Sequence, residues 1–122
     1  MTMLVQPRHV RLYYAGIQNN WELAAAEAQN LRSAFRRIAD TVPTYLNRGL
    51  DEAITAMMTP KLRAVDAAIA AGDAKQFTRA YGDLTAACNA CHAYLEHPFL
   101  VIKTPDPQAH AAYPDQDFSP VP

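Results

Sequence analysis

The stretch Cys88-Asn89-Ala90-Cys91-His92 contains the only two cysteines of the chain, and a histidine follows the second cysteine directly. Two cysteines separated by two residues and followed by histidine form the attachment pattern of c-type haem. Each thiol adds to one vinyl group of the haem, which makes two thioether bonds. In a helix, Cys88 and His92 share one face and Cys91 lies beside them. The pattern therefore predicts one covalent haem, held by both cysteines, with His92 as the proximal iron ligand.

Two other kinds of site also use cysteine and histidine at short spacing. A closed structural zinc site needs four ligands, and the sequence has no second ligand pair at the spacing of a zinc finger. A thioredoxin-like redox pair follows a strand in a βαβ pattern, and no such pattern is evident. A zinc or thiol protein without haem remains the alternative to a c-type cytochrome. An absorption spectrum would distinguish the two.

The composition indicates a single globular domain covering residues 1–122. Half of the 122 residues are hydrophobic and 19% are charged, which is enough to bury one core. The formal net charge of −1 gives no sign of a nucleic-acid partner. No apolar run approaches the roughly 20 residues that a membrane-spanning helix needs. We expect neither a nucleic-acid partner nor a membrane span.

The N-terminal residues do not resemble a secretory signal peptide, because no basic region precedes an apolar one. Haem c is normally attached outside the cytoplasmic membrane. The motif therefore implies a periplasmic protein, and we expect this chain to be a mature or truncated form from which a leader is missing.

Apolar residues recur at helical spacing in four segments. Pro7 suits the first turn of the first segment and Gly16 its end. Asn20 and Asp73 are expected to cap the second and fourth segments. Thr59-Pro60 interrupts the third segment, either by starting a new helix or by kinking a continuous one. The four segments are residues 7–16, 21–42, 50–72 and 74–96.

The haem motif lies on the apolar face of the fourth segment. The residues that make up this face are Phe77, Tyr81, Leu84, Cys88, Cys91 and Leu95. The chemistry of the motif and the face expected to be buried therefore coincide.

After Glu96 the composition changes. Six of the nine prolines lie in residues 98–122, which predicts turns and extended chain in a tail of about residues 97–122. The apolar residues 99–102 can form an extended segment packed on the helices. His97 and His110 are expected to be ordinary surface histidines.

Four amphipathic segments with a haem-c motif near the end of the last one resemble the class II c-type cytochromes, which include cytochrome c-prime. Residues 8–16, 20–24 and 84–92 look similar to a small exported bacterial monohaem subgroup. The resemblance covers about residues 7–95 and implies an all-α, up-down-up-down four-helix bundle, which we expect at about residues 7–96. The short first helix and the proline-rich tail depart from the cytochrome c-prime pattern.

The expected function is single-electron transfer between redox partner proteins by a monohaem c-type cytochrome, through the Fe(II)/Fe(III) couple. No catalytic constellation of residues stands out, so we do not expect an enzyme. The alternative is a haem protein with an open distal site that binds or senses nitric oxide or carbon monoxide.

The sixth iron ligand decides between these two functions. In an up-down-up-down bundle the start of the first helix lies beside the end of the fourth, which brings His9 and Met3 near His92. His9 lies within the first helix and is preorganised, whereas ordering Met3 costs backbone entropy. We expect His9 to be the ligand, with Met3 second and an open site third. Met57 and Met58 could in principle reach an iron, but we expect them to fill the core.

Overall fold

The computed structural model describes residues 4–42, 44–45, 48–108 and 115–121 of the chain. Helices make up most of these residues, so the expectation of an all-α protein is confirmed. Two short strands, β1 (Thr44–Tyr45) and β2 (Arg48–Gly49), pair in antiparallel fashion, which the sequence did not predict. The helices in the described residues are α1 (Gln6–Ile17), α2 (Trp21–Thr41), α3 (Leu50–Met57), α4 (Thr59–Ala71) and α5 (Ala74–Tyr94).

Side-chain caps start the two longest helices. At the start of α2, the Asn20 side chain accepts a hydrogen bond from the Leu23 amide at 3.1 Å. At the start of α5, the Asp73 carboxylate accepts hydrogen bonds from the Lys75 amide at 3.0 Å and the Gln76 amide at 3.1 Å. These bonds satisfy amides that have no partner inside their helix. Both caps expected from the sequence are therefore confirmed.

The breaks around α4 also follow from local chemistry. The third apolar segment is two helices, because α3 ends at Met57 and α4 begins at Thr59. Pro60 lies in the first turn of α4, where its missing N–H costs little. Of the two alternatives for this interruption, the new helix is the one observed. α4 ends at Ala71 and is followed by Gly72, whose φ of 62° lies in the left-handed region that glycine adopts at low cost.

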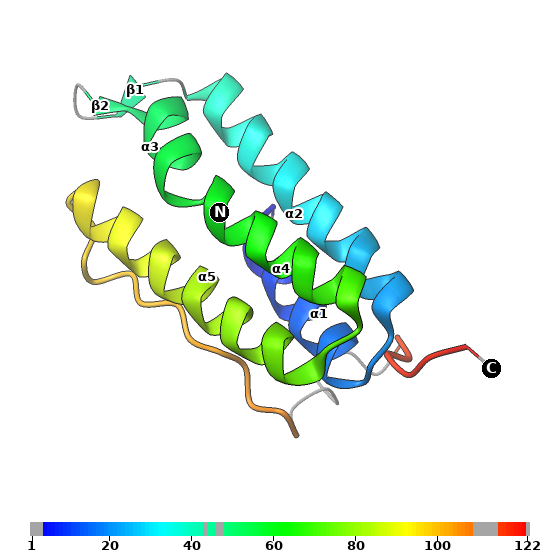
Figure 1. The fold of residues 1–122 in the computed structure, drawn as a ribbon. Helices are drawn as coiled ribbons and strands as arrows, with labels where there is room; N and C mark the ends of the chain where they lie inside the picture. Colours follow the sequence, from blue (N-terminus) through cyan, green and yellow to red (C-terminus); the bar gives the residue numbers. More distant parts are fainter. Residues whose placement is uncertain (1–3, 43, 46–47, 109–114, 122) are drawn as a thin grey trace.

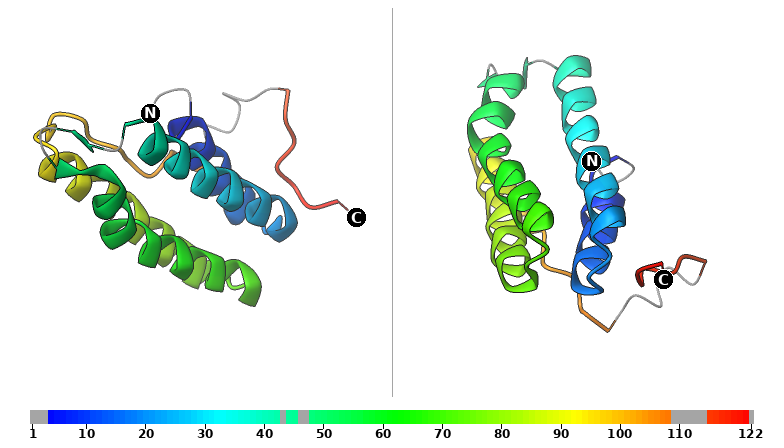
Figure 2. Two further views of the ribbon diagram at one scale, coloured as in Figure 1. Left: turned by 90° about the horizontal axis from the view of Figure 1, so that it is seen from above. Right: turned by 45° about the vertical axis from the view of Figure 1, so that its right-hand side comes forward.

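The helices form two layers. Figure 2 shows α1 and α2 in one layer and α3, α4 and α5 in the other. Within the layers α1 packs on α2 and α4 packs on α5, and contacts of α2 with α3 and α4 and of α1 with α5 join them (Figure 1). The core lies between the layers. Its largest fully buried side chains are Leu12, Leu31, Met58, Val65, Phe77, Tyr81 and Leu84.

The residues after α5 fold back along that helix (Figure 1). The parts of this tail that the structure describes, residues 95–108 and 115–121, contain no helix or strand. The Tyr14 hydroxyl donates a hydrogen bond to the Asp106 carbonyl at 3.0 Å, and the Asn20 side-chain amide donates one to the Ser119 carbonyl at 3.1 Å. Phe118 is buried against Tyr14, with ring centroids 5.5 Å apart. The tail is therefore fastened to the layer of α1 and α2.

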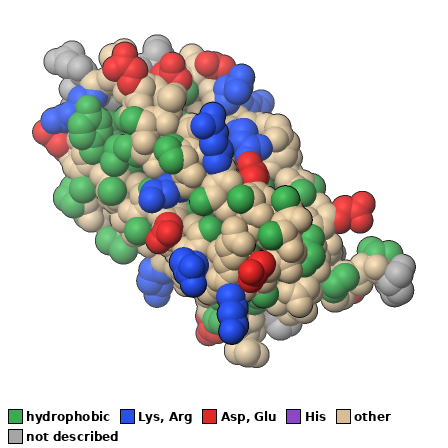
Figure 3. Space-filling model, in the orientation of Figure 1, with side chains coloured by type: hydrophobic (Ala, Val, Ile, Leu, Met, Phe, Trp, Pro, Cys, Tyr) green, Lys and Arg blue, Asp and Glu red, His purple; other side chains and the backbone are tan. Residues whose placement is uncertain are grey.

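The surface carries both signs of charge. Figure 3 shows basic and acidic side chains interspersed over the face that carries α4 and α5, as the net charge of −1 would suggest. Among the described helices, none combines the length and the apolar character needed to cross a membrane.

Gly16 and Gly82 test the contact between α1 and α5. A Cβ added at Gly16 would lie 2.1 Å from Cε1 and Cζ of the Phe77 ring, whereas a Cβ at Gly82 would meet nothing within 4 Å. We expect Gly16→Ala to lower the free energy of unfolding by about 1–3 kcal/mol through overpacking. Gly82→Ala is expected to raise it by about 0.5–1 kcal/mol, because alanine is a better helix former.

The measurement is urea denaturation followed by circular dichroism at 222 nm, with both variants compared with the parent chain. Equal stability of the two alanine variants would contradict the close approach of α1 and α5.

Candidate functional site

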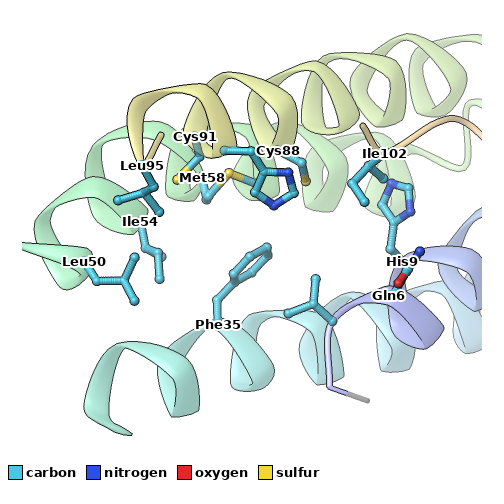
Figure 4. A pocket seen from close by; sticks show the side chains of 12 residues that line it. Gln6, His9, Phe35, Leu50, Ile54, Met58, Cys88, Cys91, Leu95 and Ile102 are labelled. Carbon is cyan, nitrogen blue, oxygen red and sulfur yellow. The ribbon is translucent and has the colours of Figure 1, made fainter. Parts of the chain in front are cut away.

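A mostly apolar cavity of about 50 Å³ lies between the start of α1, α2, α3 and the C-terminal part of α5. It brings together both cysteines, His92 and His9, which come from opposite ends of the sequence. Figure 4 shows Phe35 entering from one side, with Cys88, Cys91 and Met58 on the other. The lining residues are Val5, Gln6, His9, Phe35, Leu50, Ile54, Met58, Cys88, Cys91, His92, Leu95 and Ile102.

His92 is buried and its ring is held by the tail. Its Nδ1 lies 2.9 Å from the carbonyl oxygen of Leu100. A carbonyl can only accept, so Nδ1 carries the proton and donates. In the neutral imidazole, which is the form that binds a metal, Nε2 is then the unprotonated nitrogen. Such a bond from the second ring nitrogen also fixes the orientation of a metal-binding histidine.

The two cysteines are free and buried in the wall of the cavity. Burial raises the pKa of the Cys88 thiol to about 12, and the neighbouring Cys91 adds to this rise. Burial also raises the pKa of Cys91. Both thiols are therefore protonated at neutral pH and are poor nucleophiles while the helices are closed around them.

His9 lies in the wall of the same cavity, and its ring is held by α5. Its Nε2 lies 2.9 Å from the Thr85 hydroxyl, and its ring stacks on Tyr81 with centroids 4.7 Å apart. The Thr85 hydroxyl donates to the Tyr81 carbonyl at 3.0 Å, so it accepts from His9 and Nε2 carries the proton. Burial lowers the pKa of His9 to about 4, which keeps the imidazole neutral.

The sequence predicted that His9 and His92 would meet, and both do line one cavity. However, Thr85 precedes His92 by seven residues of α5, which is about 10 Å along a helix axis. The His9 ring therefore lies about two turns from His92, beside its partner Thr85. Iron ligation by His9 stays a prediction. Met3, the other candidate, lies outside the described residues, as does His110.

Met58 lines the cavity, although the sequence favoured a core role for it over binding iron. It is 1% exposed, which confirms its place in the core, and its side chain also forms part of the cavity wall near Cys91 (Figure 4). The break between α3 and α4 falls at this residue. The signal in the sequence was the methionine directly before Thr59-Pro60, where the helical periodicity is interrupted.

The side chains that line this cavity suit a covalent haem, but the free volume is too small for a porphyrin unless some of them move. Two thiols, one accessible imidazole nitrogen and apolar walls are what a c-type haem needs. A cavity of about 50 Å³ is smaller than the roughly 150 Å³ that holds benzene. The side chains of Phe35, Leu50 and Ile54 opposite α5 must therefore move aside to admit a porphyrin.

The described residues offer no ligand set for a closed zinc site. No group of three or more His, Cys, Asp or Glu side chains in this part of the chain is placed to hold a metal ion, whereas a structural zinc site has four ligands.

Comparison with known proteins finds no family model, no curated protein and no solved structure that matches the chain.

The raised pKa values of Cys88 and Cys91 predict slow thiol chemistry in the folded chain. In protein prepared without haem, we expect a thiol reagent at pH 8 to react at least about tenfold more slowly than in urea, because thiolate is the reactive form. The measurement is the rate of absorbance change with a chromogenic disulfide. Equal rates in native and unfolded protein would show that the thiols are not buried.

The lowered pKa of His9 predicts that the free energy of unfolding depends on pH. The unfolded chain takes up the proton near pH 6.5 and the folded chain only near pH 4, so stability is full above pH 6.5 and falls between these values. We expect a loss of up to about 3 kcal/mol in the haem-free protein, measured by denaturation at several pH values. His9→Gln should remove the slope, whereas His97→Gln should keep it.

Proposed function

We propose that this chain is a monohaem c-type cytochrome of the class II kind, which transfers single electrons between redox partner proteins in the periplasm and is not an enzyme. One observation carries the proposal. Cys88, Cys91 and His92 line a single apolar cavity, with Nδ1 of His92 bonded to a carbonyl and Nε2 left as the iron-binding nitrogen. A surface motif without a cavity would not support it.

The proposal includes an up-down-up-down four-helix bundle in which α3 and α4 together form the third arm. The turn at Gly72 between α4 and α5 and the contacts of α1 with both α2 and α5 support this topology. The proline-rich residues after α5 are proposed to be an extended tail. The absence of helix and strand from the described tail residues, 95–108 and 115–121, is consistent with this.

Thioether bonds from Cys88 and Cys91 and the Nε2 atom of His92 would hold the haem, which supplies an iron that cycles between Fe(II) and Fe(III). The chain then has three tasks. The Leu100 carbonyl keeps His92 in the Nε2-binding tautomer. The apolar walls exclude water, and the helices keep the ligands fixed so that little rearrangement accompanies a change of charge.

We propose His9 as the sixth iron ligand. Its low pKa favours this, because a neutral imidazole is the form that binds iron. Binding requires its ring to leave the Thr85 hydroxyl. Met58 is a second candidate because its thioether already lies on the cavity wall, and Met3 is a third.

The position of His9 also favours a second candidate function. If its ring stays on Thr85 and Tyr81 and neither methionine binds, the sixth position of the iron is open. The protein would then bind nitric oxide or carbon monoxide rather than carry electrons.

Absorption spectra of protein coexpressed with the haem-attachment machinery test the proposal. We expect a Soret band that survives acid-acetone extraction and sharp, split bands in the reduced state. The double variant Cys88→Ala/Cys91→Ala should lose covalent haem, and His92→Ala should lose the low-spin spectrum. Parent protein without covalent haem would refute the proposed function. A broad high-spin spectrum that shifts with carbon monoxide would instead establish the gas-binding function.

The sixth ligand is tested by His9→Ala, Met58→Ala and Met3→Ala in the haem-loaded protein. We expect only His9→Ala to convert the low-spin signal to a high-spin one in electron paramagnetic resonance. If His9→Ala stays low-spin with unchanged g-values while a methionine variant turns high-spin, that methionine is the ligand.

A further inference from the structure

The part of the tail that passes the haem motif is not held mainly by burial of its side chains. Phe99, Leu100 and Val101 are 74%, 44% and 66% exposed, although the sequence suggested that this apolar stretch packs on the helices. Of residues 99–102, only Ile102 reaches the cavity (Figure 4). Since exposed side chains contribute little, polar contacts of the backbone must fix this segment.

Asn89 makes two of these contacts from its place between the cysteines. Its side-chain amide nitrogen donates to the Ile102 carbonyl at 2.9 Å, and its oxygen accepts from the Ile102 amide at 2.7 Å. The side chain therefore pairs with both backbone groups of one residue, much as a neighbouring strand would. Asparagine suits this task because its side chain carries both a donor and an acceptor.

The clamp on Ile102 lies close to the hydrogen bond of His92. Asn89 and His92 are three residues apart on α5 and so share a face. Leu100, whose carbonyl accepts from Nδ1 of His92 at 2.9 Å, is only two residues before Ile102. The position of Ile102 therefore restricts where the Leu100 carbonyl lies, together with the hydrogen bond that the Leu100 amide donates to the His97 carbonyl at 3.0 Å.

We propose that Asn89 is a positioning residue that clamps residues 100–102 across the motif, so that the Leu100 carbonyl fixes the tautomer of His92 and Ile102 closes the cavity. This positioning role rests on the proposed cytochrome function in one respect, namely that Nε2 of His92 binds iron. When the clamp is lost, the segment leaves α5, water replaces the carbonyl at Nδ1, and the ring is free to exchange its proton between the two nitrogens.

The experiment compares Asn89→Ala with Asn89→Asp and with the matched control Asn30→Ala, an exposed asparagine of α2. In full-length protein without haem, we expect hydrogen exchange of the Ile102 amide to be about tenfold faster in Asn89→Ala. Asn89→Asp keeps the acceptor and loses the donor, so its exchange should be intermediate. Asn30→Ala should match the parent.

A second measurement follows His92 directly. Nitrogen-15 spectra of the neutral imidazole should show a proton on Nδ1 alone in the parent and in Asn30→Ala, and a mixture of tautomers in Asn89→Ala. In the haem-loaded protein, excess imidazole should displace His92 about tenfold faster in Asn89→Ala. Covalent attachment should persist, because both cysteines are unchanged.

Unchanged Ile102 exchange together with an unchanged His92 tautomer in Asn89→Ala would overturn the positioning role. This outcome differs from failure of the proposed function, which would appear as parent protein that takes up no covalent haem. The measurements on haem-free protein stand in either case.

Discussion

α5 has one apolar face, and that face must both close the core and present the haem motif. Phe77, Tyr81 and Leu84 are fully buried on it, and Cys88 and Cys91 continue the same face to the cavity. The rest of the protein adapts to this constraint. α1 can approach Phe77 only because Gly16 has no side chain, and that approach allows His9 to reach Thr85 and Tyr81. One helix–helix contact therefore sets both the packing and one end of the site.

The sequence predicted the long helices because each has a local signal at its start and a helical period along its length. Asn20 and Asp73 cap α2 and α5, and helical periodicity covers the residues between their ends. The break at Met58 was left open, since Pro60 is compatible both with a new first turn and with a kink. The pairing of β1 with β2 was missed because strands of two residues have no periodicity to detect.

The site was predictable as far as it depends on spacing within one helix. The CxxCH motif identified Cys88, Cys91 and His92. The expectation that His9 lies near them came from the antiparallel arrangement of the first and last helices. Thr85 and Asn89 were not identified as site residues, and Met58 was ranked as a core residue above its alternative of binding iron. Their roles depend on partners distant in sequence, such as the Thr85 hydroxyl on His9 and the Asn89 side chain on Ile102. No local pattern encodes such pairs.

The attachments of the tail also have a consequence for the order of folding. The bond of Tyr14 to Asp106 and that of Asn20 to Ser119 join residues 92 and 99 positions apart. Contacts between such distant residues form late, because closing a long loop is entropically costly. The segment that crosses the haem motif lies between α5 and these anchors, so it is among the last parts to be secured. Ile102, the residue of this segment that lines the cavity, therefore closes its side of the wall only after the helices have assembled.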